Sequence, residues 1–379
     1  MIYFDNAATT KPNREVLDTF VEVNEHLYFN PNSPHQNGDQ TARLMTQSKA
    51  QIKSLLQLND QTEVIFTSGA TESNNMALKG IARHKQAFGK TIITSKLEHP
   101  SVLEVMRALA DEGFNLEFVN VTKEGRIDLE HLESLLTQDV ILVSCMHVNN
   151  ITGQIQPVAQ IASMLKQYPK VHFHVDAVQA LGKVPLITEG VDTLSVSGHK
   201  FNGLKGQGLL ITQNYHQLEP IIHGGGQELN LRSGTVNVPS NVAMVKAIRL
   251  ALENQAELSH TLSELNQAIR DYVSQFRGIV INSDESASPH ILNLSFPGVK
   301  GEVLVNAFSK RDVMISTTSA CSSKHSSLNE VLLAMGIDEK NIEGSIRLSF
   351  GSLNTMAELE PFKKAFEEIY EEVEELLRK

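Results

Sequence analysis

Lys200 is a residue that could do covalent chemistry. It closely follows an apolar run that ends at Ser197, and a glycine-rich segment, 203–208, comes after it. A lysine amine attacks a carbonyl only in its uncharged form, so a partly desolvated site that lowers the pKa from about 10.4 would make it an imine-forming nucleophile. Taken alone, Lys200 also fits a surface lysine in a turn. The residues around it must decide between this interpretation and that of a nucleophile.

An acidic residue ends another apolar run upstream. A carboxylate at the position of Asp176 could keep a pyridinium nitrogen protonated, which makes such a ring an electron sink for carbanion chemistry. Gln179, one helical turn further on, would reach the phenolic oxygen of the same ring. Taken alone, Asp176 fits a helix N-cap better, a role that it could also combine with the first.

Two segments could bind an anion. Residues 68–73 follow a predicted strand and open a helix, and the free amides of a helix N-terminus bind phosphate. A capping box built on Thr71 or Ser73 explains the same residues without a ligand. Residues 224–235 form a glycine-rich loop in which backbone groups could approach an anion closely, or an ordinary connector between domains.

The two cysteines have different surroundings. Cys321 lies in a stretch of small and polar residues, 315–327, whose periodicity fits neither helix nor strand, so we expect a mobile loop. Lys324 and His325 lie close enough in sequence to favour the thiolate, which is the nucleophilic form. Cys145 ends an apolar run and is interpreted as a buried, small hydrophobic residue.

The candidate residues follow a regular alternation of short apolar runs and longer helical patterns. This alternation predicts an α/β fold with a mostly parallel sheet and helices on both faces. The predicted strands are 64–67, 91–95, 116–119, 140–145, 171–175, 193–197 and 208–212. Ligands bind beyond the carboxyl ends of such strands, which is where the polar segments after residues 67, 145, 175 and 197 would lie.

A second, smaller unit is predicted downstream. A helical pattern over 240–276 leads to strands at 291–296 and 345–350, and then to a charged helix from about Thr355. We expect the first dozen residues to pack on this unit. The predicted domains are a large cofactor-binding domain, 15–255, and a small α+β domain, 1–14 with 256–379, which carries the cysteine loop at about 316–328.

The composition excludes several classes of function. A chain of 379 residues with 41% hydrophobic and 20% charged residues is globular and long enough for more than one domain. Its net charge of -11 argues against general nucleic-acid binding. No apolar run approaches the roughly 20 residues of a membrane span. The lack of an export signal and the presence of only two cysteines predict a cytoplasmic protein.

No metal site is predicted. His172 and His174 share one face of a strand, but no set of Cys, His or carboxylate ligands with metal spacing accompanies them. We interpret both as structural, with one of them close to the cofactor at most.

Taken together, these segments resemble the cysteine desulfurases of the class-V aminotransferase group, which depend on pyridoxal 5'-phosphate (PLP). The resemblance covers nearly the whole chain. Its markers are 3–10, 30–33, 67–75, 98–100, 149–150, 174–179, 198–200, 224–235, 319–321 and 345–349. It implies the PLP-dependent transferase fold type I, which is aspartate aminotransferase-like, with a seven-stranded sheet in the large domain. It also implies a homodimer that uses L-cysteine.

The resemblance implies a role for each matching residue. Lys200 would hold PLP as a Schiff base and move a proton, and His99 would stack on the ring and assist that transfer. Asp176 would contact the pyridinium and Gln179 the phenolic oxygen. The phosphate would be held by Ala70, Thr71, Ser197, His199 and, from the other subunit, Thr235. The substrate would be bound by Arg347 and Asn32 at its carboxylate and by Asn150, which also lies against PLP.

By the same resemblance, Cys321 would take sulfur from L-cysteine as a persulfide and release L-alanine. The sulfur would pass to an acceptor protein for iron–sulfur cluster assembly, tRNA thiolation or thiamine biosynthesis. Two residues depart from the family pattern, since Thr318 replaces a glycine and Leu204 stands where proline is common.

Other functions fit parts of the sequence. A selenocysteine lyase or another PLP-dependent class-V aminotransferase-type enzyme would use Lys200, Asp176 and Arg347 without needing a thiol. An inactive scaffold in sulfur transfer would have no need to keep Lys200, His99, Asp176 and Cys321 together.

Overall fold

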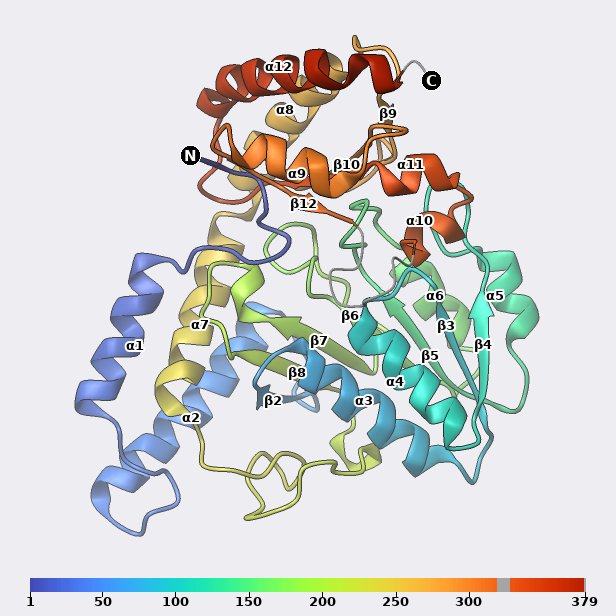
Figure 1. Ribbon diagram of the computed structural model, residues 1–379. Coiled ribbons are helices and arrows are strands. Elements are labelled where there is room, and N and C mark those ends of the chain that lie inside the picture. Colours follow the sequence, from blue (N-terminus) through green and yellow to red (C-terminus); the bar gives the residue numbers. More distant parts are fainter. Residues whose placement is uncertain (319–327, 378–379) are drawn as a thin grey trace.

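The structure is a computed structural model that describes residues 1–318 and 328–377 (Figure 1). A large sheet with helices on both faces forms the lower part of this view. A smaller sheet lies above it, together with the N-terminus and the C-terminal helix.

The large sheet has seven strands in the order β2–β8–β7–β6–β5–β3–β4. These strands are β2 (Glu63–Thr67), β3 (Thr91–Ser95), β4 (Asn115–Val119), β5 (Val140–Met146), β6 (His172–Asp176), β7 (Thr193–Ser197) and β8 (Gly208–Thr212). The two pairs that β8 makes, with β2 and with β7, are antiparallel, and all the other pairs of the sheet are parallel. The prediction of a mostly parallel seven-stranded sheet is therefore confirmed, and each strand lies within one residue of its expected ends.

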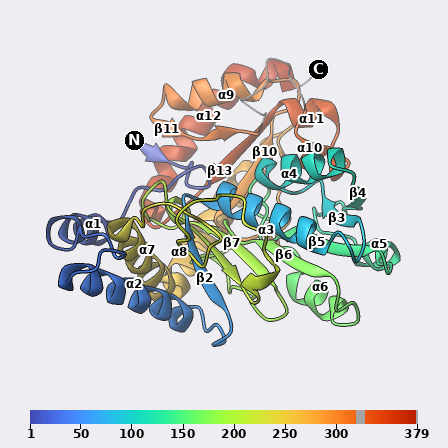
Figure 2. The ribbon, with the colours of Figure 1, turned by 90° about the horizontal axis from the view of Figure 1, so that it is seen from below.

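Helices cover both faces of this sheet, which is why its central strands β5, β6 and β7 are buried at every position. One face packs on α3 (Ala70–Lys85) and α4 (Pro100–Asp111). The other face is covered by helices that share one core, as Figure 2 shows. They are α2 (Gln36–Leu55), α5 (Leu129–Leu135), α6 (Val158–Leu165) and α7 (Val238–Glu253), with α1 (Arg14–His26) packed on α7.

The smaller sheet has four strands in the order β12–β13–β10–β9. They are β9 (Val280–Ile281), β10 (Ile291–Ser295), β12 (Ser316–Thr317) and β13 (Ser345–Ser349). Its core includes residues from α8 (Gln255–Val273), α9 (Gly301–Ser309) and α12 (Leu359–Leu377). The helical pattern predicted over 240–276 is thus two helices, because the chain leaves the helix at Asn254.

The first residues of the chain pack on the smaller sheet, as expected. β1 (Ile2–Tyr3) pairs in parallel with β11 (Val313–Met314), and Ile2 and Phe4 are buried in the same core as β10 and β13. The segment that follows β1 then runs towards Lys200 at the edge of the large sheet.

We propose the division into a large domain, 15–255, and a small domain, 1–14 with 256–379, because it follows these cores closely. A segment of the small domain nevertheless packs on the large one. Helix α10 (Glu330–Ala334) buries Val331 and Leu332 in the core that the large sheet shares with α2, α5, α6 and α7. Both carboxylate oxygens of Glu330 lie 2.8 Å from the Nη2 atom of Arg107 on α4.

Asn329 joins the two chain ends that flank residues 319–327. Its Nδ2 donates to the carbonyl of Thr318 at 2.8 Å, and its Oδ1 caps α10. Within 1–318 and 328–377, no helix combines the length and the hydropathy that a membrane span requires.

Candidate active site

A cavity of about 600 Å³ opens at the carboxyl edge of the large sheet. Residues that follow β2, β5, β6 and β7 line it, together with residues 7–9 and one residue of β13. Most of the predicted site residues lie there: Lys200, His99, Ala70, Thr71, Asn150, Asp176, Gln179, Ser197, His199 and Arg347. The expectation that the polar strand ends would meet is therefore confirmed.

Three predicted residues are not among those that line this cavity. Asn32 is exposed in the turn before α2. Thr235 lines a neighbouring cavity of about 310 Å³, which shares Ser68 and Gly206 with the first one. Cys321 lies outside the described residues. The role expected of Thr235 belongs to a second subunit, so it stays a prediction, as do those of Asn32 and Cys321.

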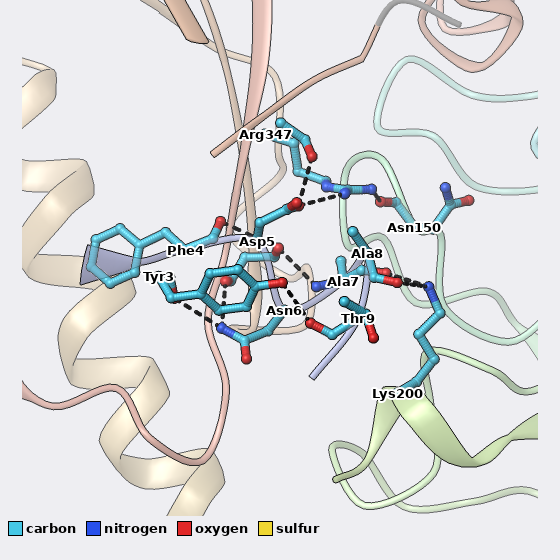
Figure 3. Close-up of polar contacts among 12 residues, drawn as sticks. Tyr3, Phe4, Asp5, Asn6, Ala7, Ala8, Thr9, Asn150, Lys200 and Arg347 are labelled. Atoms are coloured by element: carbon cyan, nitrogen blue, oxygen red, sulfur yellow. Dashed lines mark hydrogen bonds and ion pairs between the residues drawn. The ribbon is translucent and has the colours of Figure 1, made fainter. Parts of the chain in front are cut away.

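Lys200 ends a short 3-10 turn, Gly198–Lys200, directly after β7. Its Nζ donates to the carbonyls of Ala7 at 2.6 Å and Ala8 at 2.8 Å (Figure 3). Burial, reinforced by the guanidinium of Arg347, lowers the pKa of Lys200 to about 8. Near neutral pH a useful fraction of the amine is therefore uncharged, as an imine-forming lysine requires.

Asp176 ends β6 and combines the two roles considered for it. Its Oδ1 accepts a hydrogen bond from the backbone N–H of Val178 at 3.0 Å, which is a capping contact. Its Oδ2 accepts one from Nδ2 of Asn74 at 2.9 Å, and the residue still lines the cavity. Gln179 donates to the carbonyl of Ala7 at 2.9 Å, so the N-terminal segment contacts both Gln179 and Lys200.

The N-terminus of α3 faces the cavity without a cap. No side chain of the described residues caps this helix, and the hydroxyl of Ser73 instead hydrogen-bonds to Thr67. The capping-box interpretation is therefore wrong, and the first amides remain available to an anion. A Cβ on Gly208 would lie 2.5 Å from Cα of Gly69, so the start of β8 packs backbone to backbone on the turn that precedes α3.

Two neutral histidines open onto the cavity. Nδ1 of His99 accepts a hydrogen bond from the N–H of Ser101 at 3.1 Å, which places the ring proton on Nε2. Burial lowers the pKa of His99, although Asp176 partly opposes this effect. Burial, together with Lys200, lowers the pKa of His199 to about 4. Neither ring adds a positive charge at neutral pH.

Arg347 reaches the cavity from β13 of the small sheet and is only 8% exposed. Its Nη2 lies 3.1 Å from Oδ1 of Asp5, and its Nη1 donates to the carbonyl of Asn150 at 2.8 Å (Figure 3). Its Nε has no partner in the part of the chain that the structure describes. Arg347 lines the cavity, and the planar set of N–H donors of a guanidinium suits the recognition of a carboxylate.

Sequence reasoning missed Asp5 and Glu98 as site residues, although both lie in segments that carry the family resemblance. Glu98 is 3% exposed, its Oε1 accepts a hydrogen bond from the N–H of Met146 at 2.6 Å, and its Oε2 has no partner among residues 1–318 and 328–377. Burial, reinforced by Asp176, raises the pKa of Glu98 to about 8. Glu98 is therefore protonated at neutral pH and adds no second negative charge beside Asp176.

We expect Glu98→Gln to gain stability relative to the original protein as the pH rises from 6 to 9. The folded pKa of about 8 lies above the ordinary value of 4.5, so the folded state of the original protein loses stability as the pH rises through this window. Glutamine does not titrate. The difference in free energy of unfolding should grow by about 3 kcal/mol, or several degrees in melting temperature.

Thermal unfolding of both proteins at pH 6 and pH 9, at one ionic strength, checks this expectation. All other titrations cancel in the difference between the two proteins. If the melting temperatures of the two proteins differ by the same amount at pH 6 and at pH 9, Glu98 is already ionised in the folded state at pH 6.

Comparisons with known proteins agree with this geometry. The family model described as aminotransferase class-V matches residues 2–362. The chain belongs to this family. The "NifS/IcsS protein homolog" of Lactobacillus delbrueckii subsp. bulgaricus is 44% identical over 376 residues, which cover 98% of this chain and 97% of the relative.

Two further matches of this class-V aminotransferase family member also extend over nearly the whole chain. The "Cysteine desulfurase IscS" of Dictyoglomus turgidum is 38% identical, with 98% of this chain and 95% of the relative covered. A solved structure named "NIFS-LIKE PROTEIN" has a TM-score of 0.91 at 37% identity and covers 98% of this chain and 99% of its own. The fold expected from the resemblance is thereby confirmed.

PLP is the cofactor of this family, and the residues of this class-V chain fit it. Lys200 offers an amine of lowered pKa to an aldehyde, and Asp176 offers a fixed carboxylate to a ring nitrogen. The uncapped amides of α3 offer donors to a phosphate. In the described part of the chain, no group of three or more His, Cys, Asp or Glu residues could hold a metal ion.

Proposed function

We propose that this protein is a cysteine desulfurase that depends on PLP, converts L-cysteine to L-alanine and takes the sulfur onto Cys321 as a persulfide. One observation carries the proposal: Lys200, with its lowered pKa, shares a cavity with Asp176 and with Arg347. These residues supply an amine, a carboxylate and a guanidinium for PLP and an amino acid. Relatives that are named cysteine desulfurases support the same activity.

The residues of the cavity divide the work between binding and proton transfer. When bound, PLP supplies an electron sink for the electrons released at the substrate Cα. Arg347 would hold the substrate carboxylate, with Asp5 keeping the guanidinium in place. Nζ of Lys200 would take and return the proton of the substrate Cα, since a pKa of about 8 lets it both accept and donate near neutral pH.

The sulfur step belongs to Cys321. Its thiolate would attack the sulfur of the bound cysteine, so that an S–S bond forms while the bond between sulfur and Cβ breaks. The electrons of the broken bond remain on the substrate, which takes up a proton at Cβ and leaves as L-alanine. Lys324 and His325 are close in sequence and support the thiolate form.

We extend the proposal to the partners of the enzyme. A homodimer would let Thr235 of one subunit complete the phosphate site of the other, as the resemblance to the family implies. Asn32 would assist Arg347. The persulfide would be passed to an acceptor protein for iron–sulfur clusters, tRNA thiolation or thiamine, in a cytoplasm that keeps both cysteines reduced. We propose neither a membrane partner nor direct nucleic-acid binding.

An assay with L-cysteine tests the proposal. Purified protein, loaded with PLP and supplied with a thiol reductant, should release equal amounts of sulfide and L-alanine. An aminotransferase would instead require a keto acid and release no sulfide. A selenocysteine lyase would act on L-selenocysteine and leave L-cysteine unchanged, so either result would replace the proposed function.

A further inference from the structure

Strand β6 buries polar side chains at every second position. His172, His174 and Asp176 are 2%, 0% and 5% exposed, and they lie on the face of the sheet that packs on α3. Phe173 and Val175 alternate with them and pack in the core on the other face. Buried polar groups in a central strand cost free energy unless they find hydrogen-bond partners. The partners of these three side chains connect them to one another.

Four hydrogen bonds link the two histidines to the carboxylate. They join Nε2 of His172 to Oγ1 of Thr193 at 2.8 Å, and the same Oγ1 to Nδ1 of His174 at 2.9 Å. They continue from Nε2 of His174 to Oδ1 of Asn74 at 3.0 Å, and from Nδ2 of Asn74 to Oδ2 of Asp176 at 2.9 Å. We call these five residues the β6 hydrogen-bond chain.

The amide of Asn74 fixes the direction of every bond in this chain. Its Nδ2 donates to Asp176 and also to Oγ of Ser101 at 2.9 Å, so its Oδ1 must accept from His174. The proton of His174 is therefore on Nε2, and its bare Nδ1 accepts the hydroxyl proton of Thr193. The oxygen of Thr193 in turn accepts from Nε2–H of His172. Each donor thus points one step closer to Asp176.

Two further observations agree with this assignment. Nδ1 of His172, which is the bare nitrogen in this tautomer, has no partner among the described residues. Burial lowers the pKa of His174 to about 3 and that of His172 well below its usual value, so both rings are neutral. Several ionisable groups surround the β6 hydrogen-bond chain. Glu98, His99 and Lys200 lie near Asp176 at one end, and Lys85 and Asp192 lie near His172 at the other.

We propose that Asn74, His174, Thr193 and His172 are positioning residues, which hold the carboxylate of Asp176 as an oriented acceptor for the ring nitrogen of PLP. The inference rests on the proposed binding of PLP at Asp176. The N–H of Val178 holds Oδ1 and the chain holds Oδ2, so the carboxylate cannot rotate freely. Its orientation therefore depends on a hydroxyl that never touches the cofactor, that of Thr193.

Thr193→Val tests the inference, because valine keeps the shape of the side chain and removes the central hydroxyl. We expect the dissociation constant of PLP to rise about tenfold, as the loss of one or two net hydrogen bonds predicts. The visible absorbance of the bound cofactor should also titrate at a shifted pH. Thr193→Ser keeps the hydroxyl and should restore both properties.

Thr212→Val is the matched control. Thr212 lies directly opposite Thr193 on β8, is equally buried, and its hydroxyl has no partner in the described part of the chain. Removing that hydroxyl should change neither the affinity for PLP nor the absorbance. Equal effects of the two valine variants would show that Thr193 acts only through the stability of the sheet and would overturn the proposal.

The original protein, free of PLP and labelled with ¹⁵N-histidine, gives a second measurement that requires no variant. Its NMR spectrum should show His172 and His174 as neutral Nε2–H tautomers at pH 6. A proton on Nδ1 of His174, or a charged ring, would contradict the proposed directions of the bonds in the β6 hydrogen-bond chain, even if PLP binds. Conversely, if these tautomers are found but the protein has no desulfurase activity, the β6 hydrogen-bond chain is supported and only the proposed function is disproved.

Discussion

Replacing Lys200 with alanine should leave a folded protein that releases sulfide from L-cysteine at least about a thousandfold more slowly. The amine follows β7 and lies in the cavity, where it donates to the carbonyls of Ala7 and Ala8. No other lysine in the described part of the chain makes these contacts, so none can replace it. The variant would lose both the covalent attachment of PLP and the group that moves the substrate proton.

Borohydride reduction followed by peptide mapping separates these two losses. It should join PLP permanently to Lys200 in the original protein and leave the variant unlabelled. In the original protein freed of PLP, the rate of cofactor capture should rise with pH and level off above a midpoint near 8, because only the uncharged amine attacks the aldehyde. Labelling of another lysine, or capture that is independent of pH, would contradict the assignment.

Replacing Cys321 with serine should abolish sulfide release while L-cysteine still changes the visible absorbance of the cofactor. The hydroxyl of serine is not ionised near neutral pH and cannot hold a persulfide, whereas binding and proton removal depend on Lys200 and Arg347. Mass spectrometry of the original protein after brief exposure to L-cysteine should show one added sulfur atom on the peptide that contains Cys321.

Cys145→Ala is the control for the second thiol. Cys145 is completely buried in β5, and burial raises the pKa of its thiol well above the usual value, so it cannot act as a nucleophile. This variant should keep most of its activity and its persulfide. Full sulfide release by Cys321→Ser would instead favour a lyase that needs no thiol.

The large sheet could be predicted because its strands are short, apolar and separated by helical patterns. The site followed from the same pattern, since parallel strands bring the residues after Thr67, Met146, Asp176 and Ser197 to one edge. The antiparallel direction of β8 left no such trace, because a buried strand has the same apolar composition in either direction.

The contacts that the sequence did not reveal join distant residues. Asp5 and Arg347 are 342 positions apart, and neither residue type indicates its partner. The proton on Glu98 depends on complete burial beside Asp176, which no local pattern predicts. The packing of α10 on the large sheet also escaped, because a helix of five residues shows too little periodicity to reveal its buried face.

The N-terminal segment links the active site to the order in which the ribosome makes the chain. Residues 2–7 are made about 300 positions or more before their partners, which lie at 312–314 and at Ser349. The strands of the large sheet all lie within 63–212 and can assemble much earlier during synthesis. A nascent chain that stalls before β13 would therefore carry the strands of the large sheet and Lys200 but lack Arg347, so its active-site cavity would be incomplete.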